Sequence, residues 1–176
     1  MEINTDAIRR LRDYLLSHGK LRLDDDAATP DGGDGASSAG TDPWTGSAIA
    51  RRVEPFAETM FLVMMADGEP DASERSALLG ALNVLADGQV SPALFEAMFD
   101  RFTALATTEG VESRIAHLGA RLSADQDERE TAFTLAAAIA LADDHVHAHE
   151  NHTLSLIREY YGVSARRMAV LLETID

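Results

Sequence analysis

Residues 64–79, MMADGEPDASERSALL, decide the fold, because residues 140–155, ALADDHVHAHENHTLS, repeat their pattern 76 positions later. Each copy follows an apolar stretch with helical spacing and leads into another helical stretch. The pattern predicts a duplicated helix–turn–helix–turn–helix unit, and two copies favour a closed bundle with pseudo-twofold symmetry. The coinciding positions are Ala66, Asp67, Ala72, Glu74 and Leu78 in the first copy, and Ala142, Asp143, Ala148, Glu150 and Leu154 in the second.

Helical periodicity covers most of the chain, and no strand-like alternation bounded by turns is visible. The fold class is therefore expected to be all-α, a bundle of about seven helices plus an N-terminal helix. The helices are expected near 4–18, 48–66, 72–86, 92–107, 110–122, 124–142, 148–161 and 165–175. Their starts are marked by the cap residues Asp71, Ser91, Ser123 and Ser164, and their ends by Gly68, Gly88, Gly110 and Gly162.

A change in composition separates the N-terminal helix from the remaining helices. Residues 24–46, DDDAATPDGGDGASSAGTDPWTG, hold six Asp and no basic residue. Such a segment cannot bury enough apolar surface to offset the entropy of ordering it. We therefore expect an N-terminal helix within 1–23, a flexible acidic Gly/Ser-rich linker over 24–46 and a helical domain over 47–176.

Composition excludes several classes of function. The 176 residues carry 30 acidic and 15 basic side chains, a net charge of −15, which argues against nucleic acid and anionic membranes as partners. The absence of Cys excludes disulfides and thiolate chemistry. There is no apolar run long enough to span a membrane and no secretory signal, so we expect a cytoplasmic protein without direct membrane insertion. No P-loop, G-x-S-x-G or G-x-G-x-x-G motif is present, which favours a role without catalysis.

The two motifs also carry a resemblance to a known family. ADGEPDASE at 66–74 and ADDHVHAHE at 142–150, each followed by a helix and a G-x-V-S or G-V-S start, resemble the TerB-like tellurite-resistance family. The resemblance covers 47–176. It implies about seven helices with an internal pseudo-twofold, a link to tellurite and other stress resistance, and an acidic metal site of the kind proposed for that family. The second copy departs from the pattern at Asp144, which replaces Gly, and at His147, which replaces the second Asp.

The paired motifs predict a divalent-metal site where the two repeats meet. In each copy an acid ends a helix, and two further ligand-type residues follow four and seven positions later. Clustered carboxylates repel one another unless a cation neutralises them. Oxygen ligands favour calcium or manganese, whereas an imidazole shifts the preference towards zinc, so each of these ions is plausible. The expected ligands are Asp67, Asp71, Glu74, Asp143, His147 and Glu150.

Helix capping offers a second interpretation of part of this motif. Asp71 and Glu74 have the spacing of a capping box. Capping does not explain Asp67, whose negative charge at a helix C-terminus opposes the helix dipole. The histidines of the second copy, His145, His149 and His152, share one helix face, and their role is left open.

We therefore expect a stress-response protein of the tellurite-resistance type, with a non-catalytic divalent-metal site, that acts by binding other proteins. Whether it forms an oligomer is left open. Two alternatives stay open as well: a helical carboxylate-bridged di-metal enzyme, either a hydrolase or an oxidase, and a metal-free interaction scaffold. No Glu is followed three residues later by His, which counts against a ferritin-like di-iron site.

Overall fold

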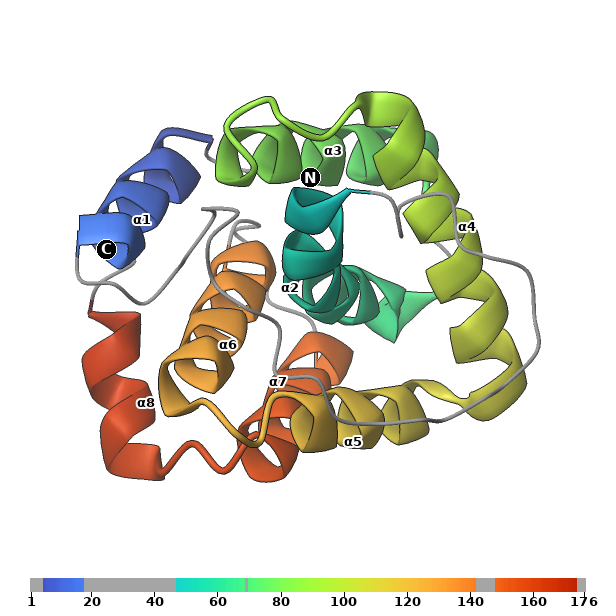
Figure 1. Ribbon diagram of the computed structural model, residues 1–176. Helices are drawn as coiled ribbons and strands as arrows, with labels where there is room; N and C mark the ends of the chain where they lie inside the picture. Colours follow the sequence, from blue (N-terminus) through green and yellow to red (C-terminus); the bar gives the residue numbers. More distant parts are fainter. Residues whose placement is uncertain (1–4, 18–46, 69, 142–147, 174–176) are drawn as a thin grey trace.

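The computed structural model describes residues 5–17, 47–68, 70–141 and 148–173, and within these ranges it is all-helical (Figure 1). The predicted all-α class is therefore confirmed, while the internal duplication stays a prediction. The elements are α1 (Thr5–Ser17), α2 (Ala48–Met64), the short 3-10 helix η1 (Met65–Asp67), α3 (Ala72–Leu85), α4 (Pro92–Glu109), α5 (Val111–Arg121), α6 (Gln126–Ala140), α7 (Ala148–Tyr160) and α8 (Ala165–Leu172).

Helix α2 lies at the centre of the bundle, with the other helices arranged around it (Figure 1). It packs against α3, α4, α5, α6 and α7, and its longest shared surface is with α6. Every residue from Phe56 to Met64 is buried, and the same holds from Glu130 to Ala140 in α6. A helix that is buried all round belongs in the interior of a bundle, so α2 and α6 form its inner pair.

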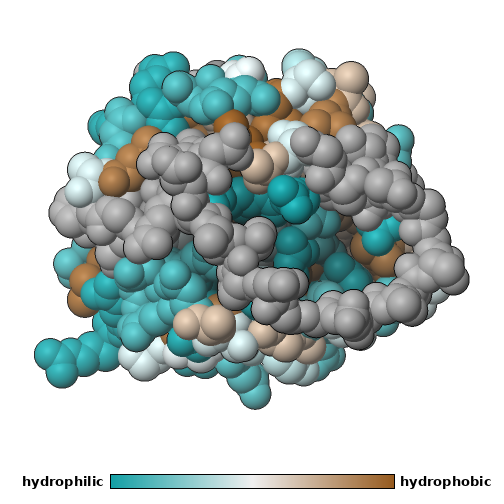
Figure 2. Space-filling model, viewed as in Figure 1, coloured by the Kyte–Doolittle hydropathy of each residue, from teal (hydrophilic) through white to brown (hydrophobic). Residues whose placement is uncertain are grey.

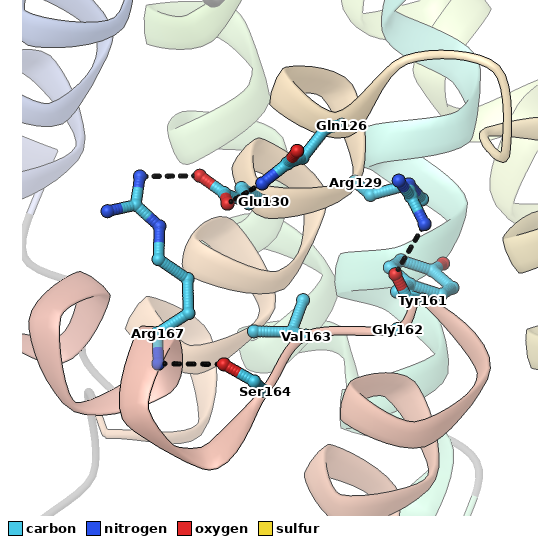
Figure 3. A pocket seen from close by; sticks show the side chains of 8 residues that line it. All are labelled: Gln126, Arg129, Glu130, Tyr161, Gly162, Val163, Ser164 and Arg167. Atoms are coloured by element: carbon cyan, nitrogen blue, oxygen red, sulfur yellow. Dashed lines mark hydrogen bonds and ion pairs between the residues drawn. The ribbon is translucent and has the colours of Figure 1, made fainter.

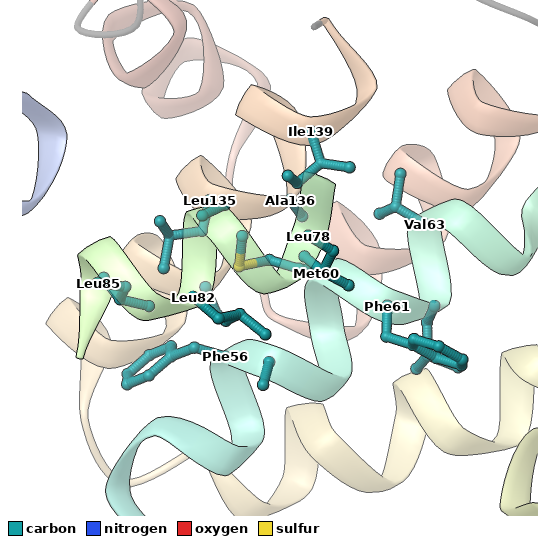
Figure 4. Close-up of a cluster of buried hydrophobic side chains, with 14 of the residues drawn as sticks. Phe56, Met60, Phe61, Val63, Leu78, Leu82, Leu85, Leu135, Ala136 and Ile139 are labelled. Carbon is teal, nitrogen blue, oxygen red and sulfur yellow. The ribbon is translucent and has the colours of Figure 1, made fainter. Parts of the chain in front are cut away.

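The core around α2 includes a mainly aliphatic cluster and a cluster of aromatic rings. Met60 of α2 lies among Leu78 and Leu82 of α3 and Leu135 of α6 (Figure 4). Phe61 points the other way and stacks on Phe99 of α4 with ring centroids 5.3 Å apart. Burial of each such side chain stabilises the fold by roughly 1.5–3 kcal/mol. The core thereby holds both α3 and α4 against α2, and α3 and α4 also contact each other.

Helix starts follow the predicted caps with one exception. The side chains of Asp71, Ser91 and Ser164 accept hydrogen bonds from the first turns of α3, α4 and α8. The prediction of Ser123 as the cap of α6 was wrong. Asp125 caps that helix, because its carboxylate accepts from the backbone N–H groups of Asp127 and Glu128 at 2.8 and 3.3 Å. Helix ends follow the predicted glycines, and all four have positive φ: Gly68, Gly88, Gly110 and Gly162.

Helix α1 packs against α3 and α6 and adds to the same core. Ile8 is buried within that core. Arg12 donates to the main-chain oxygen of Val84 at 2.9 Å and to the carboxylate of Asp87 at 2.8 Å, both at the end of α3. The predicted linker over 24–46 lies outside the described residues.

On the face seen in Figure 2, the described residues are mostly hydrophilic, with apolar residues in separate patches. The larger exposed apolar side chains are Leu16, Leu141, Tyr160 and Val170. None of the helices seen in the described ranges is long and apolar enough to cross a membrane.

Candidate functional site

The first acidic motif folds as a helix end, a turn and a helix start. Helix α2 tightens into η1, which ends at Asp67, and the N–H of Gly68 donates to the carbonyl of Met65 at 3.2 Å. Gly68 has φ of 132°, a conformation that other residues rarely adopt. The chain then enters α3 at Asp71. We call the segment that carries Asp67, Asp71 and Glu74 the acidic corner.

Asp71 and Glu74 form the capping box that their spacing predicts. One oxygen of Asp71 accepts from the N–H groups of Ser73 and Glu74 at 2.7 and 2.9 Å, and one oxygen of Glu74 accepts from the N–H of Asp71 at 2.9 Å. Both carboxylates use a single oxygen in this box, and Asp71 is exposed to solvent. The box therefore provides acceptors for N–H groups at the start of α3, and it uses only one oxygen of each carboxylate.

The basic residue next to the box is held by α4. Arg75 donates to Glu96 at 2.8 Å and to Asp100 at 2.9 Å, and its guanidinium lies 5.6 Å from the centre of the Phe99 ring. The hydrogen bond to Glu96 is the main cause that raises the pKa of Arg75. Its charge is thus compensated by two acids of α4, and the Asp71–Glu74 pair is bound through backbone N–H groups.

The second motif is described only in part. Asp143 and His147 lie outside the described residues, as do Asp144 and His145. Glu150 and His149 belong to the first turn of α7, and Asp67 to η1, but their side chains lie outside the description. His152 is on α7 and is exposed. The predicted six-ligand set therefore stays a prediction.

The packing of the elements brings one part of the two motifs together. Segment η1, with Asp67, packs against α7, which begins within the second motif. The hydroxyls of Thr59 in α2 and Tyr161, just after α7, lie 2.7 Å apart. Helix α2 therefore lies beside the C-terminal end of α7 at Thr59, and the segment that follows it, η1, contacts α7 as well.

The other half of the acidic corner packs elsewhere. Helix α3, which carries Glu74, packs against α1, α2 and α4. Within the described ranges, no group of three or more His, Asp or Glu side chains is close enough to hold a metal ion. The structure thus shows Asp71 and Glu74 hydrogen-bonded in one capping box, and it shows the segment of Asp67 in contact with α7. A complete ligand set for a metal ion would have to include side chains that the structure does not describe.

Two charged features were not singled out from the sequence. The first is a buried ion pair between α2 and α5. One oxygen of Glu58 lies 2.8 Å from both Nε and a terminal nitrogen of Arg114, which also binds Glu109 at 3.1 Å. Burial raises the pKa of Glu58, and the attraction of Arg114 only partly opposes this rise. A signal was present in the sequence, because Glu58 interrupts an otherwise apolar helical stretch.

The second feature is a polar pocket of about 200 Å³ between α6, α8 and the turn that joins α7 to α8 (Figure 3). Two carboxylate oxygens of Glu130 accept from Gln126 at 2.9 Å and from Arg167 at 2.6 Å. Arg129 lies on another wall and donates to the carbonyl of Tyr161 at 3.2 Å. No short motif marks this pocket, because its residues come together only through the packing of three elements.

The fold and the acidic corner define an all-helical protein with an acidic turn at the end of its central helix. Over residues 56–172, which is more than half of the chain, the sequence matches the family model of tellurite resistance protein TerB. The chain belongs to this family, and the resemblance seen in the two motifs is confirmed. Membership supports a function of the tellurite-resistance type. No curated protein matches the chain, and no solved structure does.

Proposed function

We propose that this TerB-family chain takes part in tellurite-resistance-type stress protection by binding a divalent cation at the acidic corner, without catalysis. We further propose that the bound cation controls association with a protein partner, since the corner is at the surface. The observation that carries the proposal is the packing of η1 against α7, because the start of the first motif then lies beside the helix that begins in the second.

Electrostatics support a cation at this position. Asp67 closes the α2–η1 unit, where the partial charge of the helix dipole is negative, so its carboxylate is unfavourable there by itself. A helix end also presents backbone carbonyl oxygens, which are hard ligands of the kind that calcium and manganese prefer. A cation beside Asp67 would therefore offset both the carboxylate and the helix end.

The capping box adds ligands that are already in place. Its hydrogen bonds hold the carboxylates of Asp71 and Glu74 near one another, with one oxygen of each outside the box. Preorganised ligands lower the entropy cost of binding. If side chains of the second motif join them, the proposed ligands are Asp67, Asp71, Glu74, Asp143, His147 and Glu150, and the plausible ions are zinc, manganese and calcium.

A metal-free interaction scaffold is the competing function, and one observation favours it. The capping box by itself gives Asp71 and Glu74 a complete structural role. The two functions differ in what they predict when Asp71 loses its charge but keeps its capping ability.

The experiment compares Asp71→Asn with Asp125→Asn. Asn and Asp are about equal as caps, and Asp125 caps α6 in the way that Asp71 caps α3, so both variants lose one charge at one cap. Unfolding is measured in chelator and then with manganese, calcium or zinc. At about 100 times the dissociation constant, a bound ion should raise the unfolding free energy by roughly 2.7 kcal/mol.

We expect the wild type and Asp125→Asn to gain this stability and Asp71→Asn to gain clearly less. Equal gains in all three proteins would remove Asp71 from the ligand set. If no ion stabilises the wild type, the proposed cation site is wrong and the scaffold is favoured.

A further inference from the structure

The pocket beside α8 lies away from the acidic corner, and its charge is opposite to that of the chain. Two arginines and one glutamate line it, so its walls carry one net positive charge, whereas the chain carries −15. Figure 3 shows Arg129 and Arg167 on opposite sides with Glu130 between them. The pocket therefore differs in kind from a cation site.

Both carboxylate oxygens of Glu130 accept hydrogen bonds from neighbouring side chains. Glu130 is only 4% exposed, and its two oxygens accept from Gln126 at 2.9 Å and from Arg167 at 2.6 Å. The charge of Arg167 is thereby compensated within the pocket wall. In the described part of the chain, the ion pair of Glu130 is with Arg167 and not with Arg129.

The guanidinium of Arg129 has a different environment. It donates to the main-chain carbonyl oxygens of Tyr161 at 3.2 Å and Asp125 at 3.4 Å, and it makes no ion pair with any carboxylate in the described part of the chain. Carbonyl oxygens orient a guanidinium without cancelling its charge. Since the fork has five N–H donors, donors are left over for a ligand in the pocket.

The start of α8 adds a second source of positive potential. Ser164 caps this helix by accepting from the N–H of Arg167 at 3.2 Å, and both Gly162 and Ser164 line the pocket. The first N–H groups of a helix favour a negative charge nearby. The helix start and Arg129 thus act on the same cavity.

We infer that this pocket binds a small oxyanion, either free phosphate or the phosphate group of a small molecule. Arginine forks match the paired oxygens of phosphate, and the negative charge of phosphate is opposite to the net charge of the pocket walls. A volume of about 200 Å³ suits a group of this size and is below that of a typical drug-sized ligand site. The inference is independent of the proposed cation site.

The first test introduces a negative charge without losing a cap. Ser164→Asp keeps the N-cap, because Asp and Ser are about equal there, but it adds a carboxylate to the pocket wall. Ser91→Asp is the matched control, since Ser91 caps α4 in the same way and does not line the pocket. Binding of inorganic phosphate, and separately of glycerol phosphate, is measured by calorimetry at constant ionic strength, with chloride as the background anion.

We expect saturable phosphate binding by the wild type and by Ser91→Asp, with a loss of about tenfold or more in Ser164→Asp. Tighter binding of glycerol phosphate would assign the site to a phosphorylated molecule, and equal or weaker binding would assign it to the free ion. If the wild type shows no saturable binding of either probe, or if Ser164→Asp binds as the wild type does, the inference is overturned.

A second pair of variants tests the arginine itself. Arg129→Gln and Arg166→Gln remove the same charge from neighbouring elements, but exposed Arg166 does not line the pocket. We expect a loss of about tenfold or more only for Arg129→Gln, and Arg129→Lys should restore part of the affinity because it restores the charge but not the fork. Equal affinities of Arg129→Gln and Arg166→Gln for phosphate would also overturn the inference.

Discussion

The buried pair of Glu58 with Arg114 and the exposed box of Asp71 with Glu74 use acidic side chains in opposite ways. Glu58 has a side chain that is 1% exposed and is bound by a guanidinium. Asp71 is in water and is bound by backbone N–H groups. In the interior the charge is cancelled within the fold, so the pair has a structural role. At the corner the hydrogen bonds of the box are satisfied by backbone N–H groups and not by a guanidinium, and the proposed cation site depends on the negative charge that remains there.

The two regions also differ in how much free energy of unfolding is lost when one of their residues is replaced. Removing one partner of a buried ion pair leaves an uncompensated charge in the interior and costs roughly 3–5 kcal/mol. Removing an N-cap typically costs only about 1 kcal/mol. The two regions can therefore be separated by measuring stability and ion binding in the same variants.

The largest effect is expected from Arg114→Met, which leaves Glu58 buried without its guanidinium. The unfolding free energy should fall by roughly 3–5 kcal/mol, measured by urea denaturation. Replacing Glu58 by Met in the same chain should recover part of this loss, because it removes the buried charge. A loss below about 1 kcal/mol would contradict the structural role of the buried Glu58–Arg114 pair.

A smaller effect is expected on pH dependence. Burial raises the pKa of Glu58 in the fold, so the native protein holds this proton more tightly than the unfolded chain does. The stability that Glu58 contributes is therefore complete below the ordinary Glu pKa, and it falls as the pH rises through the higher folded pKa. The unfolding free energy of the wild type should therefore fall relative to that of Glu58→Gln as the pH rises over this interval, because Gln does not titrate. A wild type that gains stability relative to Glu58→Gln with rising pH would contradict the sign.

Gly119→Ala tests the packing of α5, the helix that carries Arg114. A Cβ at this position would lie 2.6 Å from the carbonyl oxygen of Tyr160 at the end of α7, which is closer than packed atoms allow. We expect a loss of roughly 1–3 kcal/mol in thermal or urea unfolding. Helix propensity alone predicts a gain of about 1 kcal/mol, so a stabilised variant would show that the two helices do not approach this closely.

The smallest effect belongs to the corner. Asp71→Ala should cost about 1 kcal/mol in chelator, and Asp125→Ala should cost a similar amount, because each removes one helix cap. The two variants are compared by thermal unfolding. If Asp71→Ala lowers the unfolding free energy by several kcal/mol more than Asp125→Ala without any ion present, Asp71 contributes more to stability than its exposed capping box explains.

The sequence predicted local structure well because local structure depends on neighbours. Each turn that ends at Gly68, Gly88, Gly110 or Gly162 requires positive φ, and the capping box of Asp71 needs only residues three positions apart. The error at Ser123 is local too, since two cap-forming side chains lie two positions apart and it is Asp125 that accepts from the first turn of α6.

Distant contacts could not be predicted in this way. Glu58 and Arg114 are 56 positions apart, and Arg12 meets Asp87 across 75 positions. Such pairs depend on how the helices pack, and periodicity does not define helix packing. The pocket of Arg129 and Arg167 was missed for the same reason. The acidic motifs were found because their repetition is visible along the chain.

The most direct test of the proposed cation site is a calorimetric titration of the chelator-treated wild type and of Asp67→Asn with manganese, calcium and zinc. We predict saturable binding of at least one ion to the wild type, and a loss of about tenfold or more in affinity for Asp67→Asn, because Asp67 ends the segment that packs against α7. The absence of saturable heat for all three ions, or equal affinities in the two proteins, would contradict the account.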